Sequence, residues 1–291
     1  MKLSNILKLS VVVVILHSCA TTKLAEEGNK AYHSGNHETA LTKYDQVIES
    51  KESSGKRAKA AVYAKAGQAA LALEQTDKAR KYLETARGLQ YSSPELYSGL
   101  ASIYKTIDNL SKEITALETY RKKYPEGEEI EAINARLLET YVESENWDYA
   151  LDLWPSIEAQ AQSDVDMLAN YLIVNKNLEN TTTSEKLAQK IYELDPDNIA
   201  FLEYYAEKYF WLAENLYVKE MNAYKNKKTR SQYNKLLKAL DKVWPNYQKS
   251  RDFFLKLYKI NPKPEYAEYL ARIYTRYKDE KKAAYYEKRA R

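Results

Sequence analysis

Residues 94–125 read PELYSGLASIYKTIDNLSKEITALETYRKKYP. In the first half of this stretch, bulky residues stand at Tyr97, Leu100 and Tyr104, next to the small residue Ala101. This spacing places one apolar stripe along a helix, because side chains three and four residues apart share a helical face. The second half carries Leu117 and closes on a proline, which cannot continue a helix. The stretch therefore predicts a hairpin of two packed helices.

A related pattern returns about every 34 residues, which is the period of the tetratricopeptide repeat (TPR). In that family the bulky residues occupy positions 4, 7, 11 and 24, small residues occupy 8, 20 and 27, and proline occupies 32. The hairpin at 94–125 resembles this pattern except at position 20, where Glu113 replaces a small residue. The matching residues of the other units are Gly28, Ala40 and Tyr44; Tyr63, Gly67, Ala79, Leu83 and Ala86; Leu137, Tyr141, Ala150 and Trp154; Leu168, Tyr171, Ser184 and Ile191; and Leu270, Ala271, Tyr274, Ala283 and Ala290.

The resemblance to the TPR family covers about residues 21–291 and implies an all-α solenoid of about six to seven helical hairpins. Composition agrees, because the 291 residues include only seven glycines and seven prolines, and both disfavour helix interiors. The chain also has 27 tyrosines. Tyrosine buries a ring while its hydroxyl stays hydrated, which suits positions between stacked helices. An irregular helical bundle is the alternative to the solenoid.

One unit is longer than the others. The prolines at 196 and 262 end two successive units and lie 66 residues apart, which is 32 residues more than one period. The extra residues predict an extended helical hairpin near 199–259, with the insertion at about 215–245 and a basic tip at 225–230. The hairpin is rich in aromatic residues, which are either core or a face for a partner.

The N-terminus resembles the signal of bacterial lipoproteins. Lys2 and Lys8 form a short basic region. It is followed by an apolar run, Val11 to Leu16, that is too short to span a bilayer. The run ends in Leu-His-Ser and then Cys19, the single cysteine of the chain. The resemblance implies a signal peptide at 1–18, a lipid on Cys19 and a TPR-like domain at 19–291. A plain secretory signal is the alternative. The residue after Cys19 is not aspartate, so we expect the outer membrane, with the protein facing the periplasm.

Charge and residue types argue against several functions. The chain has a net charge of +4, and removal of residues 1–18 would leave +2. Basic and acidic residues are thus nearly equal in number, which argues against nucleic-acid binding. His33 and His37 lie at the turn of the first hairpin, where two exposed histidines are a better interpretation than a metal site. No phosphate loop, catalytic triad or metal motif is present. We therefore expect no catalytic residues, no metal and no cofactor.

Stacked hairpins of this type form a groove lined by the first helix of each hairpin. The residues expected on it are Asn29, Tyr32, Lys65, Gln68, Ser102, Lys105, Arg136 and Glu139. The expected function is a membrane-anchored scaffold that binds segments of other envelope proteins in an assembly or secretion complex. The alternatives are an enzyme or accessory protein acting on peptidoglycan or polysaccharide, and a small-ligand-binding lipoprotein.

Overall fold

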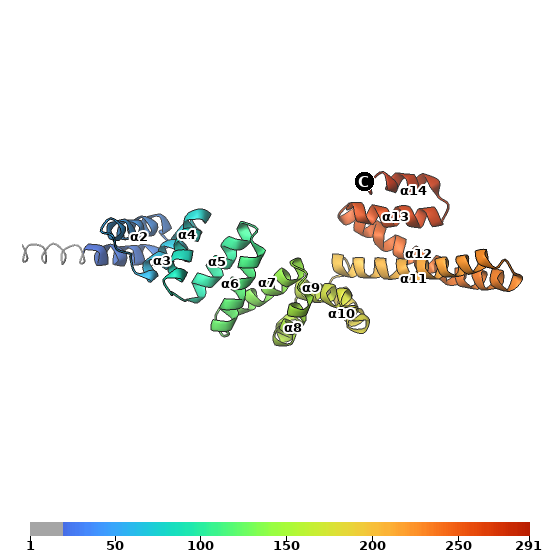
Figure 1. Cartoon of the computed structure of the whole chain (residues 1–291), viewed down its shortest axis with the longest axis horizontal. Coiled ribbons are helices and arrows are strands. Elements are labelled where there is room, and N and C mark those ends of the chain that lie inside the picture. The colour runs from blue at the N-terminus through green and yellow to red at the C-terminus, as the bar shows by residue number, and fades with distance from the viewer. Residues whose placement is uncertain (1–19) are drawn as a thin grey trace, which may run out of the picture. The chain divides into compact units, whose positions relative to one another are not determined.

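The computed structural model describes residues 20–291, and within that range every regular element is an α-helix. A first helix spans residues 20–33. The helices that follow, labelled in Figure 1, are α2 (His37–Glu52), α3 (Ala60–Ala72), α4 (Thr76–Gly88), α5 (Pro94–Thr106), α6 (Leu110–Lys123), α7 (Ile130–Glu143), α8 (Trp147–Ala161), α9 (Val165–Asn177), α10 (Thr181–Leu194), α11 (Ile199–Asn226), α12 (Arg230–Ile260), α13 (Pro264–Arg276) and α14 (Glu280–Glu287). Neighbouring helices pair into hairpins, which confirms the predicted all-α, TPR-like solenoid.

The helices form two compact units. The N-terminal unit ends at Glu145, and the C-terminal unit spans Asn146–Arg291. The predicted signal peptide and Cys19 lie outside the described residues. Within residues 20–291, no helix combines the length and the apolar character needed to cross a membrane.

Each hairpin turn except that between α11 and α12 places one residue in the left-handed backbone region. In the first hairpin that residue is Gly35, with φ of 78°. The corresponding residues of later turns are Glu74, Asp108, Glu145, Glu179 and Lys278, with φ between 53° and 58°. An asparagine or aspartate then caps the second helix in several hairpins. Asn36, for example, accepts a hydrogen bond from the backbone N–H of Thr39 at 3.0 Å. These turns separate the two helices of a hairpin without a proline.

Small residues let the two helices of a hairpin approach closely. A Cβ added to Gly67 on α3 would lie 2.5 Å from Cδ2 of Leu83 on α4. A Cβ on Gly28 would lie 2.8 Å from the ring of Tyr44 on α2. Ala79, at position 20 of its repeat, is fully buried. The small-residue positions of the TPR pattern therefore have the packing role that the sequence predicts.

Tyrosine hydroxyls join several hairpins to the one before them. Tyr104 on α5 donates to Glu84 on α4 at 2.8 Å, and Tyr141 on α7 donates to Glu118 on α6 at 2.7 Å. Both tyrosines stand at position 11 of their repeats and both carboxylates follow position 24, so the bond repeats in register. Burial, reinforced by Glu84, raises the pKa of Tyr104 above its ordinary value, which keeps the phenol a donor. Related bonds join Tyr63 to Glu52 and Tyr204 to Glu185.

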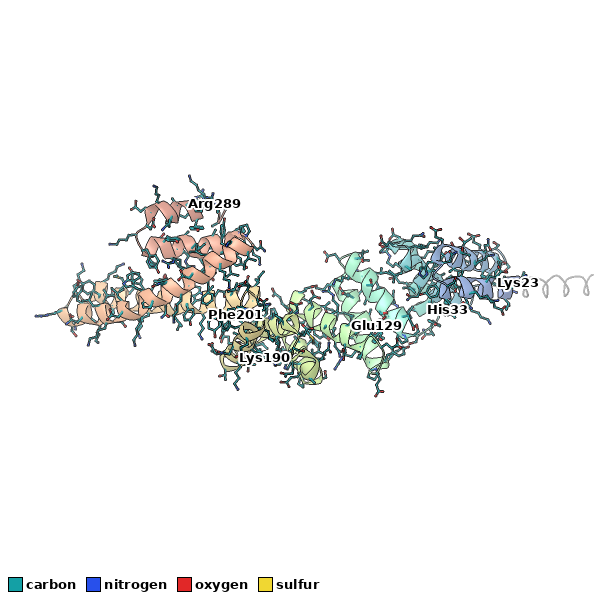
Figure 2. The ribbon with its side chains drawn as sticks, turned by 180° about the vertical axis from the view of Figure 1, so that it is seen from behind. Lys23, His33, Glu129, Lys190, Phe201 and Arg289 are labelled. Atoms are coloured by element: carbon teal, nitrogen blue, oxygen red, sulfur yellow. The ribbon has the colours of Figure 1, made fainter. Side chains whose placement is uncertain are left out.

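The extended hairpin is present as predicted, formed by α11 with 28 residues and α12 with 31. The helix continues through Pro245, and its buried side includes Tyr247 and Phe254. The hairpin is tied to the last repeat by a partly buried ion pair, in which Arg276 on α13 contacts Glu214 on α11, with Nε at 3.0 Å from Oε2. Five aromatic residues of this hairpin are core, namely Phe201 (labelled in Figure 2), Tyr204, Phe210, Tyr247 and Phe254. Trp211, Tyr233 and Trp244 are exposed, and the remaining aromatic residues are half-buried.

Candidate partner-binding surfaces

The first two hairpins bring Asn29 and Lys65 together on the face formed by their first helices. Lys65 Nζ donates to Oδ1 of Asn29 at 2.7 Å. The hydroxyl of Tyr44 donates to the same oxygen at 2.9 Å. The amide oxygen of Asn29 therefore serves the fold, because two donors from neighbouring helices already share it.

Tyr32 and Gln68 lie on the same face, near the start of α5. Gln68 Nε2 donates to the backbone carbonyl of Glu95. Tyr32 is half-buried, and its ring meets that of His37 edge-on with 5.2 Å between centroids. Burial raises the pKa of Tyr32, and the Glu95 carboxylate raises it further. Ser102 and Lys105, further along α5, are exposed. Tyr32 and Gln68 therefore both lie near Glu95, and Ser102 and Lys105 are the most open to solvent of these four residues.

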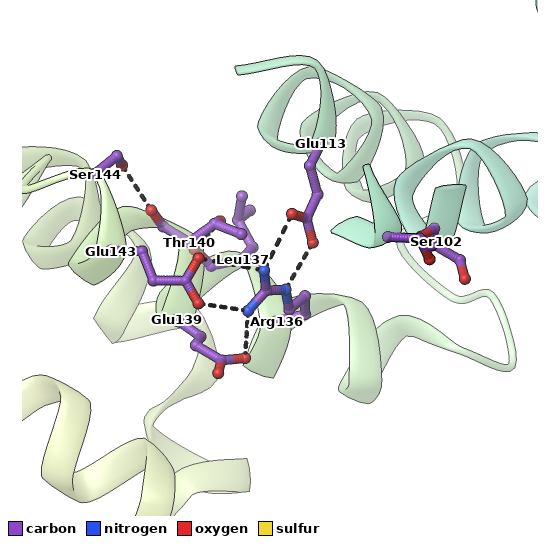
Figure 3. A network of polar contacts seen from close by, with 9 residues as sticks. Ser102, Glu113, Arg136, Leu137, Glu139, Thr140, Glu143 and Ser144 are labelled. Atoms are coloured by element: carbon purple, nitrogen blue, oxygen red, sulfur yellow. Dashed lines mark hydrogen bonds and ion pairs between the residues drawn. The ribbon is translucent and has the colours of Figure 1, made fainter. Parts of the chain in front are cut away.

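Arg136 is the centre of an ion-pair network rather than a free cation (Figure 3). Its Nε and Nη2 atoms lie 2.6 and 3.0 Å from the two carboxylate oxygens of Glu113, a two-pronged contact. Its Nη1 atom lies 2.7 Å from Glu139 and 2.8 Å from Glu143. Burial lowers the pKa of Arg136, but the carboxylates outweigh burial and raise it above its ordinary value. The contact between Arg136 and Glu113 therefore holds α7 against α6, whereas Glu139 pairs with Arg136 within α7.

The same network explains the departure from the repeat pattern. Glu113, at position 20, is 2% exposed. A buried carboxylate is costly unless it is paired and hydrogen-bonded, and Arg136 from the next hairpin supplies both contacts. The sequence pattern alone did not connect the two residues.

An open cleft of about 670 Å³ lies in the C-terminal unit between α9, α10 and α11. The second half of α11 supplies one wall through Trp211, Leu212 and Leu216. The opposite wall comes from the turn between α9 and α10, with Lys176 and Glu179. The cleft was not predicted. Its sequence signal is the excess length of the 199–259 unit, because α9 has 13 residues and α11 has 28, so α11 extends past the end of the neighbouring hairpin.

The cleft is mainly apolar with a cationic border. Leu212 is 49% exposed and Trp211 is 43% exposed, which is unusual for such side chains. Lys176 forms an ion pair with Glu207 at 2.7 Å, and Lys208 pairs with Glu185. Lys219, at the far end of the cleft, is exposed. The cleft thus offers an apolar floor with amine groups at its edge.

A second cavity, of about 400 Å³, lies on another side of α11 and is lined by aromatic rings. Tyr209 and Phe253 are nearly parallel, with centroids 6.2 Å apart and 7° between their planes. Tyr205 stacks on both, at 5.8 Å from Tyr209 and 6.0 Å from Phe253. The rings mostly contact one another, so this cavity is smaller and more internally packed than the cleft.

The titration behaviour of the carboxylates fits structural pairing rather than acid catalysis. A general acid needs a raised carboxyl pKa. Burial raises the pKa of Glu185. Hydrogen bonds and charge from Lys208, Tyr205 and Tyr204 outweigh burial, so the pKa of Glu185 lies below its ordinary value. The pKa of Glu84 is also lowered, against burial, by Tyr104 and Lys112. In residues 20–291 there is also no group of three or more His, Cys, Asp or Glu side chains able to hold a metal ion.

Comparisons with known proteins show the fold. No protein-family model matches the chain, and no curated protein sequence matches it. Among solved structures, the chain is similar to YrrB, described as a TPR protein with an unusual peptide-binding site. The identity is 18%, the match covers 62% of this chain and 89% of that chain, and the TM-score is 0.51. A MamA structure (AMB-1) matches at 13% identity over 62% of this chain and 93% of that chain, with a TM-score of 0.52.

Proposed function

We propose that this protein is a lipid-anchored scaffold of the bacterial envelope that binds segments of partner proteins and catalyses no reaction. The observation that carries the proposal is the cleft between α9, α10 and α11, because it leaves Trp211 and Leu212 exposed at the wall of a cavity. Exposed apolar patches with a polar rim mark interaction sites. The similarity to YrrB, whose description includes a peptide-binding site, supports a peptide segment as the occupant.

The proposed occupant is an amphipathic segment of a partner. A helix or strand that presents a few apolar side chains would cover Trp211, Leu212 and Leu216. Acidic residues at the edge of the segment would approach Lys219, the lysine of the cleft that forms no ion pair within the described residues. The predicted face of the N-terminal unit is less suited to this role, because the side chains of Asn29, Lys65 and Arg136 already bind within the chain.

A photo-crosslinking experiment in native membranes tests the proposal. A crosslinking amino acid replaces Leu212, and in a control it replaces Tyr285 on α14, which is exposed to a similar degree. We expect position 212 to capture one or a few envelope proteins that the control does not capture. We further expect Leu212→Asp, combined with a crosslinker at position 216, to abolish capture. Equal products from both positions, or none from either, would contradict the proposal, and the second result would favour the glycan or small-ligand alternatives.

The anchor is tested separately, in the full-length chain. Cys19→Ser removes the only possible lipid-attachment thiol, and Ser18→Ala is the control that keeps a small residue before the cysteine. After washing membranes at high salt, we expect the serine variant in the soluble fraction and the alanine control in the outer-membrane fraction, because stable anchoring needs acyl chains. A Cys19→Ser protein that stays with the washed membrane would refute lipidation as the anchor.

A further inference from the structure

Positive charge is concentrated at the end of the extended hairpin. Residues 219–242 include eight basic and two acidic side chains, a net charge of +6, whereas the whole chain carries +4. The rest of the chain is therefore slightly negative. The eight cations are Lys219, Lys225, Lys227, Lys228, Arg230, Lys235, Lys238 and Lys242, and we refer to them as the hairpin-end cations.

The hairpin-end cations are free of ion pairs. All eight are exposed, and none pairs with a carboxylate in the part of the chain that the structure describes. Elsewhere some basic residues are paired, as Lys78 is with Asp45 and Lys43 with Glu27. Uncompensated like charges repel one another, so this concentration of positive charge destabilises the hairpin end. Binding of an external anion would reduce the repulsion.

Tyrosine and aliphatic side chains accompany the charge. Tyr224 on α11 and Tyr233 on α12 face each other across the hairpin end, with 5.6 Å between ring centroids. Tyr233 is 46% exposed, and Leu237, one turn later on the same side of α12, is 44% exposed. The side chains of Lys235, Lys238 and Lys242 follow a second stripe of that helix. Tyrosine is enriched at the boundary between water and lipid, where its ring is apolar and its hydroxyl is hydrated.

We propose that the end of the α11–α12 hairpin binds the surface of a bilayer that contains anionic phospholipids. The hairpin-end cations supply attraction to the headgroup phosphates, and the exposed Tyr233 and Leu237 enter the interface between headgroups and acyl chains. Charge complementarity selects this occupant, and the exposed apolar residues favour a lipid interface over a soluble polyanion. This contact is additional to the proposed lipid on Cys19 and to the proposed protein-binding cleft, with which it shares only Lys219.

Vesicle binding of the unlipidated chain isolates this contact. The probe is the mature chain with Cys19→Ser, mixed with vesicles of phosphatidylcholine alone or with about one third phosphatidylglycerol. The test variant carries Lys225→Gln, Lys227→Gln, Lys228→Gln and Arg230→Gln. The matched control carries glutamine at four exposed lysines of the N-terminal unit, at positions 56, 81, 105 and 122. Each cation near an anionic surface changes binding by about fivefold, so we expect the loss of four cations to weaken binding by about 600-fold.

Further measurements complete the test. Parent and control should bind only the anionic vesicles, and about 0.5 M salt should release them, because the contact is electrostatic. Tyr233→Ser should weaken binding severalfold while leaving the helical circular dichroism signal unchanged. Equal loss in the test and control variants would overturn the proposal, as would binding to neutral vesicles or no binding by the folded parent. Poly-aspartate that displaces the vesicles at equal charge concentration would also overturn it and would point to an acidic protein as the partner.

Discussion

The contact between Arg136 and Glu113 gives the sharpest stability prediction. Arg136→Met keeps most of the aliphatic side chain but removes the guanidinium that binds both oxygens of Glu113. Glu113 is 2% exposed, so its carboxylate would be left without a compensating charge. Removing one partner of a buried ion pair costs about 3–5 kcal/mol. We expect a loss near the lower end of that range, because the Arg136 side of the pair is partly open to water.

Removing the carboxylate instead of the guanidinium should cost less stability. Glu113→Ala restores the small residue that the repeat pattern places at position 20, and Arg136 keeps Glu139 and Glu143 as partners. Both of those carboxylates are well exposed, so their pairs contribute only about 0–1 kcal/mol each. We expect Glu113→Ala to cost about 1–2 kcal/mol. The double variant should be more stable than Arg136→Met alone, because it leaves no unpaired buried carboxylate.

Urea unfolding followed by circular dichroism measures these differences, and hydrogen exchange of the α6 and α7 amides locates them. The control is Lys105→Met, an exposed cation on the neighbouring helix α5, which should change stability little. If Arg136→Met costs no more than Glu113→Ala, or if the double variant loses the sum of both, then the network is not the buried pair that we describe.

Two further predictions concern packing and pH. Gly67→Ala should destabilise the protein by about 1–3 kcal/mol, because the new Cβ would lie 2.5 Å from Leu83. Gly88→Ala is the control, since its Cβ would meet nothing within 4 Å, and it should be neutral or stabilising. Equal melting temperatures for the two variants would disprove the close packing at Gly67. Burial raises the pKa of Glu214, but Arg276 and Tyr247 outweigh it and lower it below its ordinary value of 4.5. This carboxylate therefore stabilises the fold above pH 4.5, and the stabilisation is lost as the pH falls through the lowered pKa. The melting temperature should fall more in the parent than in Glu214→Gln between pH 6 and pH 3, and parallel curves would contradict the assignment.

The fold was predictable because its pattern is local. The residues that define the repeat make contacts within one hairpin or between adjacent hairpins, as Ala79 and Tyr104 do. Their period along the sequence is therefore enough to identify them. The extended hairpin was predictable for the same reason. The distance between two prolines along the chain reveals 32 additional residues, and their lack of glycine favours longer helices over a new loop.

The candidate site was less predictable, because it depends on contacts between hairpins. Arg136 was expected on a binding face, yet it neutralises Glu113, and the repeat pattern does not encode that pairing. Asn29 and Lys65 likewise bond to each other. The cleft beside Leu212 arises where a long helix extends past a shorter neighbour, and that geometry requires knowledge of which helices are adjacent. The assignment of the eight expected residues to a partner remains a prediction.

The bond between a tyrosine and a carboxylate of the preceding hairpin also bears on how such a chain can change its length during evolution. Because Tyr104 and Glu84 stand at the same repeat positions as Tyr141 and Glu118, one hairpin carries the donor for its predecessor and the acceptor for its successor. A gene duplication that copies a whole hairpin therefore supplies both halves of the new junction at once. Loss of a hairpin likewise rejoins a matching donor and acceptor. Repeat number can thus drift without a compensating substitution, whereas the single extended hairpin, whose contacts have no second copy, cannot be gained or lost so freely.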